Sequence, residues 1–171
     1  VELFQIWLNL PAADKLTEPH FTMLRADAIP RVESRDDGGR LTTVTLVAGS
    51  LGEVAAPAPP PKSWASHADS HVAIWPIVME PEARWTLPAA QADLSRVLYF
   101  FAGPEVTIAG RRFREHRAVQ LRPDAAVELI NGSEESELLL LQGRPIGEPV
   151  AQHGPRSEEH TSELQSRGLI S

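Results

Sequence analysis

The chain has 171 residues, of which 42% are hydrophobic, and its formal net charge is −7. A chain of this length can bury one substantial core, but its acidic balance argues against direct binding of nucleic acid, which requires a basic surface. It contains no cysteine, which excludes disulfides and thiolate ligands, and no apolar run approaches the length of a membrane span. We therefore expect one domain in a monomeric, cytoplasmic protein without a membrane partner.

The first segment, VELFQIWLNLPAADK, alternates apolar and polar residues up to Pro11. This period of two predicts a β-strand that pairs with a segment further upstream. The apolar side chains on one face of that strand would be Phe4, Ile6, Leu8 and Leu10. Because Val1 begins directly inside this pattern, without a methionine or a signal peptide before it, we expect the natural N-terminus to be missing.

The next segments carry strand and turn signals in alternation. PHFTMLRADAIPRVE predicts a strand and a turn, and the glycine-containing turn DDGGR leads into LTTVTLVAGSLGEV, which is rich in β-branched residues. The pair predicts a hairpin. The following AAPAPPPKSW is rich in proline, which cannot donate ladder hydrogen bonds, so it predicts a stiff connecting loop in preference to a docking motif.

Four further apolar runs follow, each ended by glycine, proline or asparagine. They are HVAIWPIVMEPEARWTLPA, RVLYFFAGPEVTIAG, RRFREHRAVQLRPDAAVELING and SELLLLQGRPIGEPVAQ. Short strands at such regular spacing indicate an all-β barrel or sandwich. The polar residues 156–171, RSEEHTSELQSRGLIS, break this style and resemble a translated sequencing adapter, so we exclude them from the fold as a non-native tail.

Three long stretches, FQIWLNLPAADKLTEPHF, RVLYFFAGPEVTIAG and LLLLQGRPIGEPVAQHGP, resemble the pirin family. Pirins are bicupins, in which two antiparallel barrels pack side by side. The resemblance implies that residues 1–15 are the last strand of a missing N-terminal barrel and its linker. Residues 16–155 would form the C-terminal barrel, a cupin double-stranded β-helix of jelly-roll type.

The resemblance also implies that the metal lies elsewhere. Pirins hold iron in the first barrel through an HxH pair, a glutamate and a later histidine, and none of that segment is present. In the second barrel the position of the HxH pair holds Thr86, Leu87 and Pro88, and the later region offers Asp124 and Glu128 without a histidine. Imidazole is the usual ligand in such a site, so we assign no catalytic, cofactor-binding or metal residue to this chain.

The remaining histidines are weighed one by one. His67 and His71 lie four residues apart, a spacing that suits two metal ligands on one helix face, but their polar neighbours favour a solvated loop. His20, His116 and His153 are interpreted as surface or interface residues, and His160 falls in the excluded tail.

Two other groups of residues have a functional alternative. Four arginines form the only local basic cluster, which we interpret as a solvated hairpin, with contact to a small anion or a partner as the alternative. They are Arg111, Arg112, Arg114 and Arg117. Trp64, Trp75 and Trp85 are expected to pack in the core, although they could instead line a pocket in the barrel mouth.

For the complete protein, the resemblance implies an iron-dependent cupin that oxidises quercetin-like flavonols with dioxygen. The alternative is a redox-responsive regulator that binds transcription-factor complexes, in the nucleus as well as the cytoplasm if the source is eukaryotic. An acidic surface fits protein partners better than DNA. Fold analogy does not choose between the two, and the fragment alone is expected to be inactive.

Overall fold

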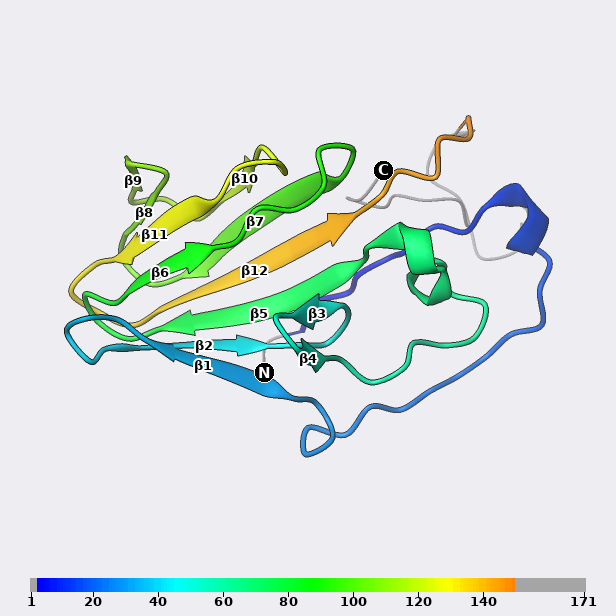
Figure 1. Ribbon diagram of the computed structural model, residues 1–171, viewed down its shortest axis with the longest axis horizontal. Helices are drawn as coiled ribbons and strands as arrows, with labels where there is room; N and C mark the ends of the chain where they lie inside the picture. Colours follow the sequence, from blue (N-terminus) through cyan, green and yellow to red (C-terminus); the bar gives the residue numbers. More distant parts are fainter. Residues whose placement is uncertain (1–2, 150–171) are drawn as a thin grey trace.

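The computed structural model of the chain describes residues 3–149, which fold into two antiparallel sheets packed face to face (Figure 1). The larger sheet has the order β1 (Arg31–Arg35), β2 (Leu41–Thr45), β5 (Ala73–Met79), β12 (Ser136–Gly143), β7 (Ser95–Ala102) and β10 (Arg117–Gln120). The smaller sheet has the order β6 (Arg84–Leu87), β11 (Val127–Asn131), β8 (Val106–Ile108) and β9 (Arg111–Phe113). The predicted all-β fold and the strands expected after residue 71 are confirmed.

The short elements lie outside the two large sheets, with the 3-10 helices towards the end opposite the β8–β9 turn and a small hairpin nearer the middle (Figure 1). They are the 3-10 helices η1 (Ala12–Asp14), η2 (Trp64–Ser66) and η3 (Ala68–Ser70) and the small hairpin of β3 (Ser50–Leu51) and β4 (Val54–Ala55). The proline-rich residues 56–60 carry no regular structure, as predicted. Within residues 3–149, no helix is both long and apolar enough to cross a bilayer.

The hydrophobic core lies between the two sheets. Successive side chains along the central strands point to opposite faces of the sheet, so every second one enters this core. In β12, Leu138 and Leu140 point into the core, whereas Leu139 and Leu141 point to the opposite face of the large sheet. That opposite face is also apolar, because Tyr99 and Phe101 of β7 lie beside them. The large sheet is therefore hydrophobic on both of its faces, which is typical of a sheet that is covered on both sides.

The N-terminal segment lies against this outer face, and its pairing with a segment further upstream remains a prediction. Residues 3–11 form no strand in the structure. Ile6 packs against the outer cluster, and the ring of Phe4 meets that of Phe101 at 4.7 Å between centroids. Phe4 and Ile6 therefore contact the sheet through their side chains, and residues 3–11 form no ladder with the rest of the described chain.

Proline at position 76 stands in a central strand, where a missing N–H normally disrupts the ladder. The pairing of β2 with β5 covers Thr42 to Val44 against Met79 to Ile77 and stops before Pro76. Pairing resumes only at the isolated bridge between Ala48 and Ile74. The break in the ladder therefore falls beside the residue that cannot donate to it.

The predicted hairpin is confirmed as β1 and β2, which pair from Arg31 with Thr45 to Arg35 with Leu41. Its turn is organised by the carboxylate of Asp36. One oxygen, Oδ1, accepts hydrogen bonds from the backbone N–H groups of Gly38 at 2.8 Å and Arg40 at 3.0 Å. The other, Oδ2, accepts from Arg40 Nε at 2.9 Å and from the backbone N–H of Arg84 at 3.0 Å. Asp36 therefore ties the edge strand β1 to the edge strand β6 of the other sheet.

These bonds predict a pH dependence for the stability of the fold. Partial burial raises the pKa of Asp36, but the hydrogen bonds from the backbone of Arg40, Arg84 and Gly38, and the charge of Arg40, lower it overall. A lowered folded pKa contributes stability that is present above the unfolded pKa of about 3.9 and is lost as the pH falls through the folded pKa.

We therefore expect Asp36→Asn to lower the urea midpoint at pH 7 and to reduce the further loss of stability on going from pH 5 to pH 2. Asp37→Asn changes an exposed carboxylate of the same turn and is the matched control. Equal acid sensitivity of the two variants would contradict the role given to Asp36.

Candidate functional site

The place where a cupin holds its metal is built differently in this barrel. Thr86 and Pro88 are exposed, and Leu87 is buried in the hydrophobic core. The two carboxylates of the later region point outward and bind arginines: Asp124 pairs with Arg122 at 2.8 Å, and Glu128 lies 3.9 Å from Arg84. The side-chain hydrogen bond from Arg122, together with its charge, lowers the pKa of Asp124 against an opposing effect of burial.

A buried cation lies beside these positions. The side chain of Arg96 in β7 is 1% exposed and shares the inward face of the strand with Leu98 and Phe100. Its Nη1 donates to the carbonyl oxygen of Pro88 at 2.9 Å, and its Nε has no protein partner. Desolvation lowers the pKa of Arg96 from its usual value, but an arginine remains charged at neutral pH.

Sequence reasoning missed Arg96, although a signal was present. The residue occupies an inward position in the alternating run SRVLYFFA, where an apolar side chain is expected. A charged residue at such a position is rare without a partner. The interruption of the pattern by one arginine could have marked this site.

These residues do not fit a metal ion. A metal site needs several converging imidazole or carboxylate donors, and among residues 3–149 no three His, Cys, Asp or Glu side chains gather in this way. The fixed charge of Arg96 would also repel a second cation in a region of low dielectric. The assignment of no metal ligand to this chain remains a prediction, and the chemistry of these side chains supports it.

Each described histidine has its own surroundings, and the structure gives them no common partner among residues 3–149. The side chain of His67 sits between η2 and η3, where its Nε2 is 3.3 Å from Asp14 Oδ2 and its ring lies 4.9 Å from that of Trp64. His71 adopts a left-handed backbone conformation at the end of η3. His20 contacts Thr22, and His116 contacts the carbonyl oxygen of Gly103. His153 and His160 lie outside the described residues.

The tryptophans divide between the core and the surface. Trp75 is buried and donates from Nε1 to the carbonyl oxygen of Ala48 at 3.0 Å, and Trp85 packs against the same core. Trp64 stands outside the barrel and donates to the carbonyl oxygen of Arg144. The three rings therefore do not line a common pocket.

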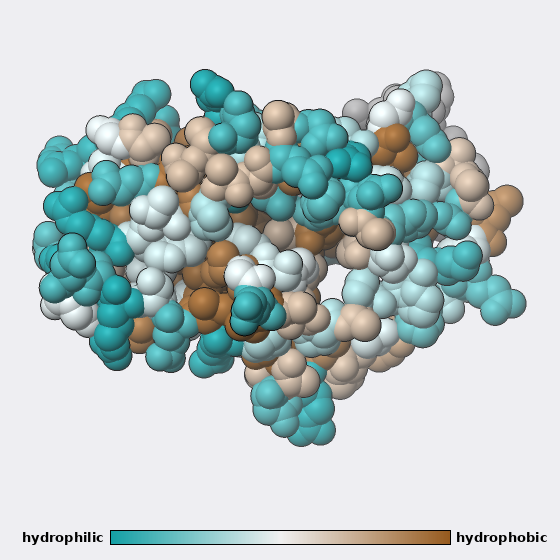
Figure 2. Space-filling view, viewed as in Figure 1, coloured by the Kyte–Doolittle hydropathy of each residue, from teal (hydrophilic) through white to brown (hydrophobic). Residues whose placement is uncertain are grey.

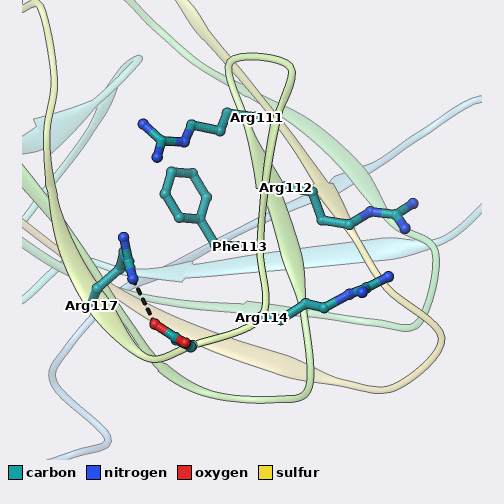
Figure 3. Close-up of a pocket in the computed structure, with 6 residues that line it drawn as sticks. Arg111, Arg112, Phe113, Arg114 and Arg117 are labelled. Carbon is teal, nitrogen blue, oxygen red and sulfur yellow. Dashed lines mark hydrogen bonds and ion pairs between the residues drawn. The ribbon is translucent and has the colours of Figure 1, made fainter.

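The basic cluster forms a pocket of about 420 Å³ around the corner that joins β9 to β10. Figure 3 shows Arg111 and Arg117 on the same side of the chain as Phe113, whereas Arg112 and Arg114 extend to the other side. The guanidinium carbons of Arg111 and Arg117 lie 5.3 and 5.7 Å from the centre of the Phe113 ring. Such contacts between a cation and an aromatic face hold the guanidinium groups in place.

A second cavity, of about 320 Å³, lies beside the β3–β4 hairpin and the proline-rich loop, where the surface in Figure 2 is hollowed. Its walls are mainly alanine and proline, together with His67 and His71. Its polar side chains are three serines and the two histidines, and its lining has none of the fixed charges of the arginine pocket. The arginine pocket is the more specific of the two.

Comparison with known protein families shows to which family the chain belongs. Residues 74–165 match the model of the pirin C-terminal cupin domain, which is more than half of the sequence. The chain belongs to the pirin family. The match runs past residue 156, where the sequence analysis places the start of a non-native tail; residues 150–171 lie outside the described part, and that boundary remains a prediction.

Several curated pirins and related proteins are similar over most of the chain. A protein of Thermoplasma acidophilum that is provisionally named quercetin 2,3-dioxygenase is 30% identical, with 88% of this chain and 56% of that protein covered. The pirin-like protein of Caulobacter vibrioides is 31% identical over 89% of this chain and 50% of its own length, and Homo sapiens pirin is 24% identical. The chain spans about half the length of the curated relatives it matches.

Solved structures agree on the fold of this pirin. A quercetin 2,3-dioxygenase from Acinetobacter baumannii superimposes with a TM-score of 0.69 at 21% identity, over 87% of this chain and 48% of that one. The protein GK1651 from Geobacillus kaustophilus gives a TM-score of 0.61 at 25% identity, over 84% of this chain and 54% of the other. The predicted cupin barrel is thus confirmed.

Proposed function

We propose that this chain is the metal-free C-terminal barrel of a two-barrel pirin whose other barrel binds iron and oxidises a quercetin-like flavonol with dioxygen. The observation that carries the proposal is the match to the pirin C-terminal cupin domain over a chain that covers about half of its relatives. The buried, positively charged Arg96 disfavours a metal ion in this barrel and so supports the assignment of iron to the other one. In this proposal iron supplies the site at which substrate and oxygen are brought together.

The division of the chain follows from the same proposal. Residues 1–15 belong to the missing barrel and its linker, residues 16–155 to the second barrel, and residues 156–171 to a non-native tail. The apolar outer face of the large sheet, on which Phe4 contacts Phe101 and is still 48% exposed, supports a further covering layer there. A cytoplasmic location remains a prediction.

Elemental analysis tests the proposal on two proteins: the 171-residue chain and the complete protein encoded by the same gene. We expect about one iron per complete protein and no iron in the chain above the level of the buffer. Stoichiometric iron in the chain would contradict the metal-free assignment, and His67→Ala would then locate the ligands, with His20→Ala as the matched control.

Turnover of quercetin by the complete, iron-loaded protein tests the activity separately. Dioxygen consumption that depends on quercetin is the expected result. Iron binding without turnover would overturn the dioxygenase assignment and favour the competing proposal of a redox-responsive protein that binds other proteins. Relatives that carry the name pirin leave that competing role open.

A further inference from the structure

The two sides of the sandwich are closed in different ways. On one side, the carboxylate of Asp36 joins the edge strands β1 and β6. On the other side, the edge strands are β9 and β10, and the chain passes between them through residues 114–116. The arginine pocket lies at this second side and is lined by residues of that corner.

The pocket contains more cations than carboxylates. Glu105 lies 3.8 Å from Arg112 and 3.2 Å from Arg114, and Glu115 pairs with Arg117 at 2.7 Å. Within residues 3–149, no carboxylate oxygen lies within 4 Å of Arg111. Four guanidinium groups thus face two carboxylates, in a chain whose formal net charge is −7.

The floor of the pocket is rigid. Phe113 is 8% exposed and belongs to the hydrophobic core, so its ring is fixed. Arg111 and Arg117 both lie over this ring, and Nη2 of Arg117 donates to Glu115 at 2.7 Å while Arg111 has no such carboxylate partner among the described residues. A guanidinium held in this way loses little conformational entropy when it binds a carboxylate through two hydrogen bonds.

The strand that carries Arg111 can also accept a backbone. β9 pairs with β8 on one side, and its other side is an edge of the sheet. An edge strand can bind an extended peptide through main-chain hydrogen bonds, while pockets beside it select the side chains. Charged side chains also protect an edge from unwanted pairing, and in that reading the arginines bind nothing.

We propose that the arginine pocket binds an extended acidic segment of a partner protein along β9, with a carboxylate held between Arg111 and Arg117. The stacked arginines supply the selectivity for acidic residues, and the free edge supplies the main-chain contacts. The proposal does not depend on iron or on flavonol oxidation in another barrel.

Fluorescence anisotropy of a labelled decaglutamate peptide with the 171-residue chain tests this proposal. We expect saturable binding that weakens as salt increases, and about tenfold or greater weakening in Arg111→Gln/Arg117→Gln, because each lost charged hydrogen bond contributes substantially. The matched control, Arg31→Gln/Arg84→Gln, removes two exposed arginines from the opposite edge strands and should change the affinity less than twofold. Thermal melting confirms that each variant folds.

Hydrogen exchange separates an added strand from a bound anion. Binding of the decaglutamate should slow amide exchange at residues 111–113, and free glutarate at the same carboxylate concentration should not displace the peptide. Equal weakening by the control variant would overturn the proposal, since binding would then follow only net charge. Displacement by glutarate, or unchanged exchange in β9, would equally overturn it in favour of a site for small anions.

Discussion

Asn131→Asp should lower the free energy of unfolding by about 3 to 5 kcal/mol at pH 7, the cost typical of an uncompensated buried charge. The side chain of Asn131 is 3% exposed, and its Nδ2 donates to the carbonyl oxygens of Met79 at 2.9 Å, Glu80 at 2.8 Å and Glu134 at 2.8 Å. A carboxylate at this position would place negative charge against three carbonyl oxygens. Such a loss is a large part of the roughly 5 to 15 kcal/mol that stabilises a typical domain.

The effect of this substitution should depend on pH in a defined direction. Burial and the three carbonyls would raise the folded pKa of the new carboxyl group above the unfolded value of about 3.9. The folded state then binds the proton more tightly, so the penalty is greatest at neutral pH and declines as the pH falls towards 4. Urea unfolding at pH 4 and pH 7 measures this difference.

Asn131→Ala is the matched control because it removes the same donor without adding a charge. It should cost about 1 to 3 kcal/mol in total, less than the aspartate variant at pH 7 and by the same amount at both pH values, because the oxygen of Glu80 keeps a second donor in the N–H of Ala83. If the aspartate variant lost no more at pH 7 than at pH 4, beyond the change seen in the alanine variant, the hydrogen-bond role of Asn131 would be contradicted.

The second large effect concerns Arg96, whose volume and charge act in opposite directions. Arg96→Ala should cost about 2 to 4 kcal/mol, because it leaves a cavity in a region that is closely packed. Arg96→Met keeps a long unbranched side chain and removes a charge that has no counterion. The methionine variant should therefore stay within about 1 kcal/mol of the original or exceed it.

Urea denaturation of both variants separates the two contributions, with Arg122→Met, an exposed arginine on the same polypeptide, as the control for a general loss of charge. A loss in Arg96→Met as large as that in Arg96→Ala would show that the hydrogen bond to Pro88 outweighs the cost of burying the charge. Iron content measured on Arg96→Met adds a second readout, because removal of the charge alone should not create a metal site where donors are lacking.

Much of the fold could be predicted from the sequence because alternation and turn residues report directly on which face of a strand is buried. The hairpin at DDGGR and the apolar runs from HVAIWPIVM to SELLLLQG all became strands. For residues 3–11 the same rule leaves the partner open, since Phe4 and Ile6 contact the outer face of the sheet without forming a strand on it. Alternation records contact with a surface and leaves the backbone partner undetermined.

The site could be predicted less completely, for a different reason. The sequence places four arginines close together. It does not reveal that two of them lie over the buried ring of Phe113 while the other two form ion pairs with Glu105. That division depends on the corner between β9 and β10. The role of Asn131 likewise arises from carbonyl groups far away in the sequence, at Met79 and Glu80, and that of Arg96 from the carbonyl group of Pro88 across the β6–β7 connection.

The position of β12 bears on how the chain can fold as it is synthesised. This strand is the last in sequence order among residues 3–149, yet it pairs with β5 on one side and β7 on the other and so joins the two halves of the large sheet. Until residues 136–143 have left the ribosome, β5 and β7 both expose unpaired apolar edges. Non-local pairing of this kind slows folding and prolongs the interval in which such edges can aggregate. The large sheet therefore cannot be completed before β12 has been synthesised.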